Sequence, residues 1–152
     1  MRYTKMLGAL FFGAALLLLF IPIAGAGTEI FEIKEKMFFQ QCNDVYINAE
    51  DYIGKTVKLE GMYMCRDFKF PNSDVMQVAH YVYRKAFICC NDDGIIGFMV
   101  LLDDCPAPRQ NEWVEATGKV EIIAPEKDGG IVVLRLTSLE VLDKRGAEYV
   151  RF

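Results

Sequence analysis

Apolar and polar residues alternate through most of the chain beyond residue 55, and a period of two is the pattern of β-strands that bury one face. In residues 56–64, Val57 and Leu59 fall on one face while Lys58 and Glu60 fall on the other. Further strands are predicted over residues 75–90, 95–104, 113–123 and 131–144. The inward faces of the last two are predicted at Val114, Ala116, Gly118, Val120, Ile122, Val132, Leu134 and Leu136.

Turn and loop residues separate these strands. Residues 91–94 (NDDG) and 125–130 (PEKDGG) have the composition of tight turns, because Gly, Pro, Asn and Asp favour turn backbones. Residues 103–112 contain two prolines, which exclude the interior of a strand. Residues 95–102 (IIGFMVLL) lack polar side chains, so we expect a central strand that is buried on both faces.

The segment before residue 55 has a helical pattern. Within residues 29–43, apolar side chains recur at three- and four-residue steps, as in an amphipathic helix. The first turn (EIFEIK) also alternates, so an extended start is the alternative. A second short helix is predicted next, with Asn48 as its N-cap and Gly54 as the residue just beyond its end.

These elements predict a mainly β domain. Five strands joined by hairpin-like connections form an antiparallel set, and closing into a small barrel hides the edges of such a set. Gly61, Gly97 and Gly118 lie inside predicted strands, where glycine permits sharp bends. The predicted fold is a five-stranded antiparallel OB-like barrel with one or two short N-terminal helices, and an open β-sandwich is the alternative.

The N-terminal segment has the features of an export signal. Arg2 and Lys5 precede an uncharged run over residues 6–28, and Ala24–Ala26 forms a small-x-small site for signal peptidase. The run also approaches the roughly 20 residues that span a bilayer, so an uncleaved anchor is the alternative. In both cases the basic residues hold the N-terminus in the cytoplasm. The remaining domain is then extracytoplasmic, either secreted or anchored to the outer face of the cytoplasmic membrane.

This division gives a signal or anchor at residues 1–26 and one domain at residues 27–152. Without Arg2 and Lys5, the domain has 15 basic and 21 acidic residues, a net charge of −6. Binding to phosphate groups needs clustered Lys and Arg, and the basic residues of the domain are scattered. We therefore expect no nucleic acid as a partner.

Four segments together resemble a known family. They are IKEKMFFQQCNDVYINAEDYIGKTVKLEGM, FICCNDDGIIGFMV, WVEATGKVE and LTSLEVLDKRGAEYV. The chain resembles the soluble domain of an uncharacterised bacterial family, whose members are described as subunits of a two-component membrane permease complex. The resemblance covers about residues 33–150, and CC followed by G-x-x-V and DKRGAE are its most specific elements. It implies a permease-like membrane protein as partner, and it brings no catalytic residues.

Five cysteines and a single histidine supply the soft donor atoms of the chain. Neighbours on a regular strand point to opposite faces, so Cys89 and Cys90 join one site only where their strand ends or bulges. Thiolates and imidazoles favour zinc or copper. The candidate ligands of such a site are Cys89, Cys90, Cys42, Cys65 and His80. Free thiols without a ligand, and disulfides linking Cys89 or Cys90 to Cys42, Cys65 or Cys105, are the alternatives.

No catalytic pattern accompanies these thiols. The chain has no G-x-S-x-G motif, and its Asp pairs at 92–93 and 103–104 fall in turns, where Asp is common for backbone reasons. Tyr81 and Tyr83 share a strand face, where aromatic pairs either pack in the sheet or stack on a ligand. We expect a non-enzymatic accessory domain that binds a small ligand or a membrane partner, with a cysteine-centred metal site. The alternatives are a disulfide-stapled interaction module and, last, a thiol-dependent enzyme.

Overall fold

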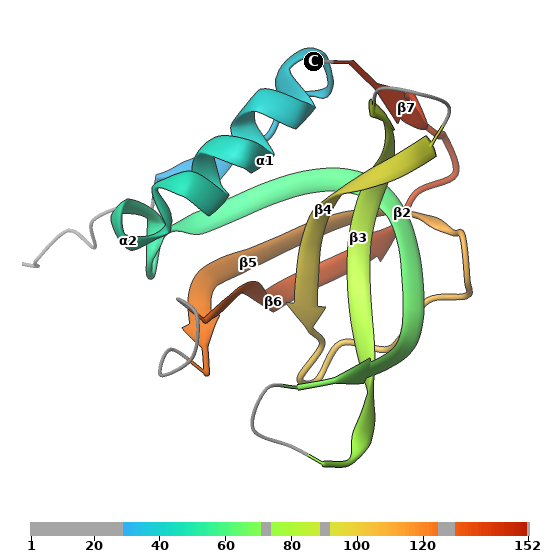
Figure 1. The fold of residues 1–152 in the computed structure, drawn as a ribbon. Helices are drawn as coiled ribbons and strands as arrows, with labels where there is room; N and C mark the ends of the chain where they lie inside the picture. The colour runs from blue at the N-terminus through green and yellow to red at the C-terminus, as the bar shows by residue number, and fades with distance from the viewer. Residues whose placement is uncertain (1–28, 71–73, 89–91, 125–129, 152) are drawn as a thin grey trace, which may run out of the picture.

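The structure is a computed structural model that describes residues 29–70, 74–88, 92–124 and 130–151 (Figure 1). The predicted signal or anchor, residues 1–26, lies outside the described residues, as do Cys89 and Cys90. Within the described ranges, no helix combines the length and the apolar character that crossing a membrane requires.

The described part of the chain is mainly β, as predicted. Its helices are the 3₁₀ helix η1 (Glu35–Met37), α1 (Phe38–Ile47) and α2 (Ala49–Tyr52). Its strands are β1 (Ile30–Glu32), β2 (Thr56–Lys69), β3 (Met76–Ile88), β4 (Asp92–Leu101), β5 (Trp113–Ile123), β6 (Ile131–Val141) and β7 (Tyr149–Val150). The long strands β2 to β6 correspond to the five predicted strands.

Hydrogen-bonded pairing links the five long strands into a ring. β2 pairs with β3 and β5, β5 with β6, β6 with β4, and β4 with β3. All of these pairings are antiparallel except that of β4 with β6, in which Met99 lies opposite Val133. The prediction of an entirely antiparallel set is therefore wrong, and the sheet is mixed. The order of the strands explains the difference. β5 follows β4 in the sequence but pairs with β2 instead of β4. β6 pairs antiparallel with β5 and therefore runs in the same direction as β4.

Two short strands extend this sheet. β1 runs parallel to β2, and β7 runs parallel to β3. The sequence does not predict β7, because two residues are too few for a period to appear. The helix predicted over residues 29–43 is wrong at its start, since residues 30–32 are extended and α1 begins only at Phe38. The extended start given as the alternative, on the alternation of EIFEIK, is confirmed.

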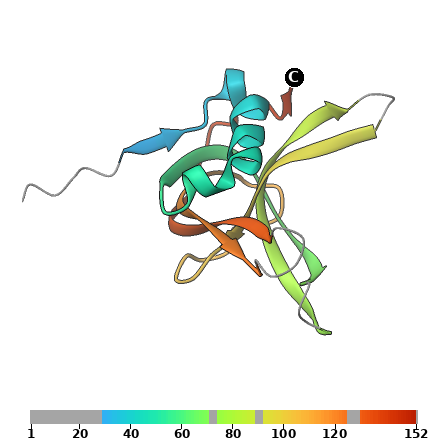
Figure 2. The ribbon, with the colours of Figure 1, turned by 60° about the vertical axis from the view of Figure 1, so that its left-hand side comes forward.

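The main hydrophobic core lies between α1 and the ring of strands (Figures 1 and 2). Phe38, Cys42 and Val45 of α1 are almost fully buried there. The predicted inward faces are confirmed by the burial of Val57, Leu59, Val114, Ala116, Val120, Val132, Leu134 and Leu136. Alternation alone therefore identified most of the strand residues in this core.

β4 is buried on both faces only in its second half. Phe98, Met99 and Val100 are buried, whereas Ile95 is 43% exposed. Burial of the whole apolar run was the prediction, and it is wrong for the first residues. The reason is that the β3–β4 hairpin projects beyond the body of the domain, as Figure 2 shows.

Glycines inside the strands allow neighbouring backbones to approach closely. A Cβ on Gly61 would lie 2.7 Å from the carbonyl oxygen of Tyr83, and one on Gly118 would lie 2.6 Å from that of Arg135. Both distances are shorter than real Cβ contacts. These positions therefore require glycine for space, consistent with the predicted role of strand glycines.

The short helix α2 is also found. The turn predicted over residues 91–94 is wrong for Asp92, Asp93 and Gly94, because these residues begin β4 and pair with the end of β3. Most of the turn predicted over residues 125–130 lies outside the described residues. Asn48 is the N-cap residue of α2, although its side-chain amide binds Asp44 Oδ1 at 2.7 Å rather than the helix end. Gly54 follows the helix with φ +77°, a left-handed conformation that suits glycine. A loop separates β4 from β5 as predicted. β5 and β6 form a hairpin in which Ile123 lies opposite Ile131.

Arg84 of β3 is a buried cation. The residue is 1% exposed, and its guanidinium carbon lies 4.7 Å from the ring centroid of Phe38 and 4.8 Å from that of Trp113. The two aromatic faces attract the positive charge and exclude water from it. A charge buried in this way needs hydrogen-bond acceptors from the protein.

These acceptors come from three separate segments of the chain: β2, η1 and the residues before β7. Arg84 Nε donates to the carbonyl oxygen of Glu60 at 2.8 Å, and Nη1 donates to Glu35 Oε2 at 3.2 Å and to the carbonyl oxygen of Ala147 at 3.0 Å. Glu35 Oε2 also accepts the N–H of Ala147 at 3.0 Å. Arg84, Glu35 and Ala147 are called the Arg84 clasp below. The clasp holds η1 and the segment before β7 against the ring.

Candidate functional site

Two candidate ligands, Cys65 and His80, are brought together by the structure. They are direct partners in the antiparallel pairing of β2 and β3, so their side chains share one face. Cys65 is exposed and His80 is partly buried. Cys42 lies apart from them in the main core, and it is 0% exposed. Cys89 and Cys90 lie outside the described residues.

Tyr63 orients the imidazole of His80. It precedes Cys65 by two residues on β2 and so lies on the same face. Its ring stacks on the imidazole, with 5.9 Å between centroids and 22° between planes, and its Oη lies 2.6 Å from His80 Nδ1. The Cys65 thiol is near enough to the same hydroxyl group to contribute to the raised pKa of Tyr63. The three side chains are called the Tyr63–Cys65–His80 site.

Gln110 reaches this site from the loop between β4 and β5. Its Oε1 accepts the backbone N–H of Cys65 at 3.0 Å and lies 3.7 Å from Cys65 Sγ. Two backbone hydrogen bonds hold the loop against β2 next to the site. The N–H of Asn111 donates to the carbonyl oxygen of Tyr63 at 2.8 Å, and the N–H of Tyr63 donates to the carbonyl oxygen of Glu112 at 2.9 Å. The amide oxygen of Gln110 is thereby held beside the thiol.

The protonation of the site follows from its burial. Burial lowers the pKa of His80 below its usual value of 6.5, so the imidazole is neutral at pH 7. Burial, with a smaller contribution from the Cys65 thiol, raises the pKa of Tyr63 to about 12, so its hydroxyl group keeps its proton. A neutral imidazole that donates Nδ1–H to Tyr63 Oη presents the lone pair of Nε2 to a ligand.

Sulfur and imidazole nitrogen form the donor pair that zinc and copper favour. The described residues hold no group of three or more His, Cys, Asp and Glu side chains that could bind a metal ion. The amide oxygen of Gln110 is a further donor atom beside the Cys65 thiol. Cys65 and His80 can therefore provide two soft ligands, with this oxygen atom next to them.

Sequence reasoning placed Cys65 and His80 among the candidates, but it did not include Tyr63 or Gln110. The position of Tyr63 beside Cys65 was predictable, because residues two apart on a strand share a face. The position of Gln110 was not predictable, because a loop residue follows no period. Cys105, in the same loop, is partly buried against the main core and carries a free thiol, as do Cys42 and Cys65.

Asp103 has a structural partner. Arg135 Nη1 donates to both of its carboxylate oxygens at 2.8 Å, and Arg135 Nε donates to Glu121 Oε1 at 2.9 Å.

Tyr81 and Tyr83 pack in different apolar clusters, so they do not form one stacking platform.

Residues 24–151 match the family model described as the DUF1980 C-terminal domain. The chain belongs to this family. The matched range includes the ring of strands, the Arg84 clasp and the Tyr63–Cys65–His80 site, and membership confirms the resemblance to an uncharacterised family. A search of curated proteins gave no match.

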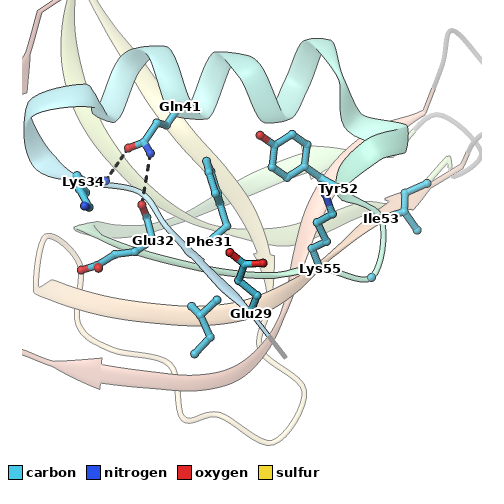
Figure 3. A pocket seen from close by; sticks show the side chains of 10 residues that line it. Glu29, Phe31, Glu32, Lys34, Gln41, Tyr52, Ile53 and Lys55 are labelled. Atoms are coloured by element: carbon cyan, nitrogen blue, oxygen red, sulfur yellow. Dashed lines mark hydrogen bonds between the residues drawn. The ribbon is translucent and has the colours of Figure 1, made fainter. Parts of the chain in front are cut away.

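This DUF1980 C-terminal domain also has an open pocket of about 840 Å³ beside β1 (Figure 3). Phe31 and Tyr52 meet edge-on in its wall, with 5.3 Å between ring centroids. The Tyr52 hydroxyl donates to Asp44 Oδ2 at 2.5 Å, and this hydrogen bond raises the pKa of Tyr52 to about 12. Ile30 and Ile53, at 51% and 54% exposure, add apolar surface at the pocket. The DUF1980 C-terminal domain therefore has a candidate metal site and a separate open pocket with apolar and charged side chains in its lining.

Proposed function

We propose that this DUF1980 C-terminal domain is an exported, non-enzymatic accessory domain that binds a thiophilic metal ion, Zn²⁺ or Cu⁺, at the Tyr63–Cys65–His80 site. The observation that carries the proposal is the cross-strand pairing of Cys65 with His80, the only histidine of the chain. Tyr63 supplies the hydrogen bond that metal-binding imidazoles make through their second nitrogen. Such a partner fixes the ring orientation before the metal arrives.

The order of strand pairing supports a binding role. The strand order β2–β3–β4–β6–β5, with β4 parallel to β6, supports the proposal that the ring is an OB-like barrel. Barrels of this kind bind ligands on a strand face and on the loops beside it. This likeness is one of fold alone, so the assignment of a metal rests on the donor atoms and not on the fold.

Export and a membrane partner belong to the same proposal. Arg2 and Lys5 before an uncharged run favour export of the domain, either with cleavage after Ala26 or with an anchor retained. The resemblance to permease-complex subunits favours a permease-like membrane protein as the partner. The net charge of −6 in residues 27–152 favours such a partner over nucleic acid.

The test is metal binding by the full chain, purified with reductant and without chelators. We expect about one Zn²⁺ or Cu⁺ per chain, measured by elemental analysis and by competition with a chromophoric chelator, with the two metals assayed separately. Cys65→Ser and His80→Gln are expected to weaken binding at least about tenfold, as loss of a ligand does. Cys105→Ser is the matched control, because it removes a thiol outside the site.

Two results would contradict the proposal. One is a wild-type chain that retains no metal in either assay. The other is a Cys65→Ser variant that binds as tightly as the wild type. If Cys89→Ser/Cys90→Ser loses the metal and Cys65→Ser does not, the site lies at the adjacent cysteines and the assignment to Cys65 is wrong.

A further inference from the structure

We infer that the pocket beside β1 is a docking site for an extended peptide of a partner protein, which adds as a further strand to the open edge of β1. The inference concerns residues on another part of the domain and does not depend on metal binding at the Tyr63–Cys65–His80 site. It rests on the hydrogen-bonding groups of β1, on the apolar wall of the pocket and on the charges at its rim.

One edge of β1 has no strand partner among the residues that the structure describes. β1 is the first strand in the order of the sheet, and within the described ranges its only partner is β2. The N–H of Ile33 donates to the carbonyl oxygen of Lys58 at 2.8 Å, on the β2 side. Backbone groups alternate between the two edges of a strand, so those of Ile30, Glu32 and Lys34 point to the open edge. An edge of this kind is a template for another chain.

Gln41 of α1 already makes part of the hydrogen-bonding pattern of a neighbouring strand. The N–H of Lys34 donates to Gln41 Oε1 at 2.7 Å, and Gln41 Nε2 donates to the carbonyl oxygen of Glu32 at 3.4 Å (Figure 3). One carboxamide thus takes the place of one peptide group. The N–H of Glu32 and the backbone groups of Ile30 continue the same edge, and an extended backbone is the partner that fits them.

The pocket provides apolar contacts for the side chains of such a strand. In β-strand addition, main-chain hydrogen bonds give affinity and pockets for alternate side chains give specificity. Phe31 and Tyr52 form one wall, and the half-exposed Ile30 and Ile53 lie at the opening. Figure 3 shows Phe31, Tyr52 and Ile53 on the same side of α1 as Gln41.

The charges at the rim help to define the occupant. Glu29, Glu32, Lys34 and Lys55 line the pocket, and none of them forms an ion pair within the described part of the chain. Their charges sum to zero, which disfavours a polyanion. They suit a peptide with an apolar centre and with polar or charged residues of both signs at its ends. The structure therefore assigns the site to an extended segment of this composition.

The test uses a displayed library of random peptides of about ten residues, selected against the full chain. Glu32→Pro removes the N–H that points to the open edge, and Pro is tolerated on edges of this kind. Its control is Glu32→Gln, which keeps the N–H and removes the charge. Ile53→Asp places a charge at the pocket opening, and its control is Ile47→Asp, at an isoleucine that is 71% exposed on α1.

We expect the selection to enrich peptides with alternating apolar residues. These should bind Glu32→Pro and Ile53→Asp at least about tenfold more weakly than the wild type, and both controls within about twofold. Thermal melting of each variant checks that it is folded. The inference is overturned if no peptide is enriched, or if Glu32→Pro and Ile53→Asp leave peptide binding unchanged. It is also overturned if a second copy of the chain occupies the edge in solution, which would be seen as a dimer that Glu32→Pro dissociates.

Discussion

Glu35 Oε2 lies 3.2 Å from Arg84 Nη1, and the two side chains differ sharply in their contact with water, since the arginine is 2% exposed and the glutamate 52%. The positive charge therefore depends on the protein for its solvation, whereas the carboxylate retains water on one side. Replacing Glu35 therefore lowers stability mainly through Arg84, the buried donor that loses an acceptor, and less through the contacts of Glu35 itself.

We expect Glu35→Gln to lower the free energy of unfolding by about 1 kcal/mol. Arg84 keeps its carbonyl acceptors but loses its one carboxylate partner among the described residues, and solvent screening limits the effect. Urea denaturation measures it. Glu115→Gln is the control, since its partner Lys58 is 33% exposed and can regain water, so this change should cost less than about 0.5 kcal/mol. Equal losses in both variants would contradict the special role of the clasp.

The same carboxylate gives a pH dependence. The N–H of Ala147, and then the Arg84 guanidinium, hold the pKa of Glu35 below its usual value of 4.5. Because the folded pKa is the lower one, this stabilisation is complete above the unfolded pKa and is lost as pH falls through the folded pKa. Between about pH 5 and pH 3, stability should fall more steeply in the wild type than in Glu35→Gln. Urea titrations at each pH test this, and parallel curves would refute it.

Two glycines should respond differently to Ala. Gly61→Ala is expected to cost about 2 kcal/mol or more, because the new Cβ meets the backbone of Tyr83 and strand pairing must shift. Gly54→Ala should cost about 1 kcal/mol, because its surroundings are open and only the positive φ is unfavourable. Gly54→Asn should recover part of that loss, since Asn tolerates this conformation, whereas Gly61→Asn should not. Denaturation midpoints decide between these outcomes.

Tyr63→Phe should weaken metal binding about tenfold while leaving both proposed ligands in place, because the imidazole of His80 loses the hydroxyl group that orients it. The chelator competition assay provides the measurement. Tyr81→Phe is the control: the Tyr81 hydroxyl is buried without a hydrogen-bond partner in the described residues, so its removal should leave affinity unchanged. If the two variants bind metal equally, Tyr63 has no positioning role.

Much of the fold was predictable because it depends on local patterns. The alternation around Val57 and Leu59, and around Val114 and Ala116, identified strands and their buried faces. The parallel pairing of β4 with β6 was not predictable, because it depends on which strands β5 and β6 choose as partners. An extended start over β1 was only the alternative, because the helical period of the following residues competes with the alternation of EIFEIK. β7 was missed because two residues carry no period and its place depends on hydrogen bonds to β3.

Candidate residues were predictable by type, but their neighbours in space were not. His80 and Cys65 stood out as soft donors, whereas their pairing depends on the register of β2 against β3. Arg84 appeared to be one of several scattered basic residues. Its position two residues after the apolar Val82 and two before Ala86, on the inward face of β3, was the available signal that it is buried.

The Arg84 clasp also affects when the domain can finish folding. Ala147 and β7 leave the ribosome after every strand of the ring, so Arg84 lacks one of its acceptors until synthesis of this segment is complete. If the domain is exported as proposed, such a delay would keep the native state incompletely stabilised until this segment has also crossed the membrane. A truncation before residue 147 should therefore leave a domain in which Arg84 lacks the Ala147 carbonyl oxygen, and limited proteolysis should cleave it faster than the full chain.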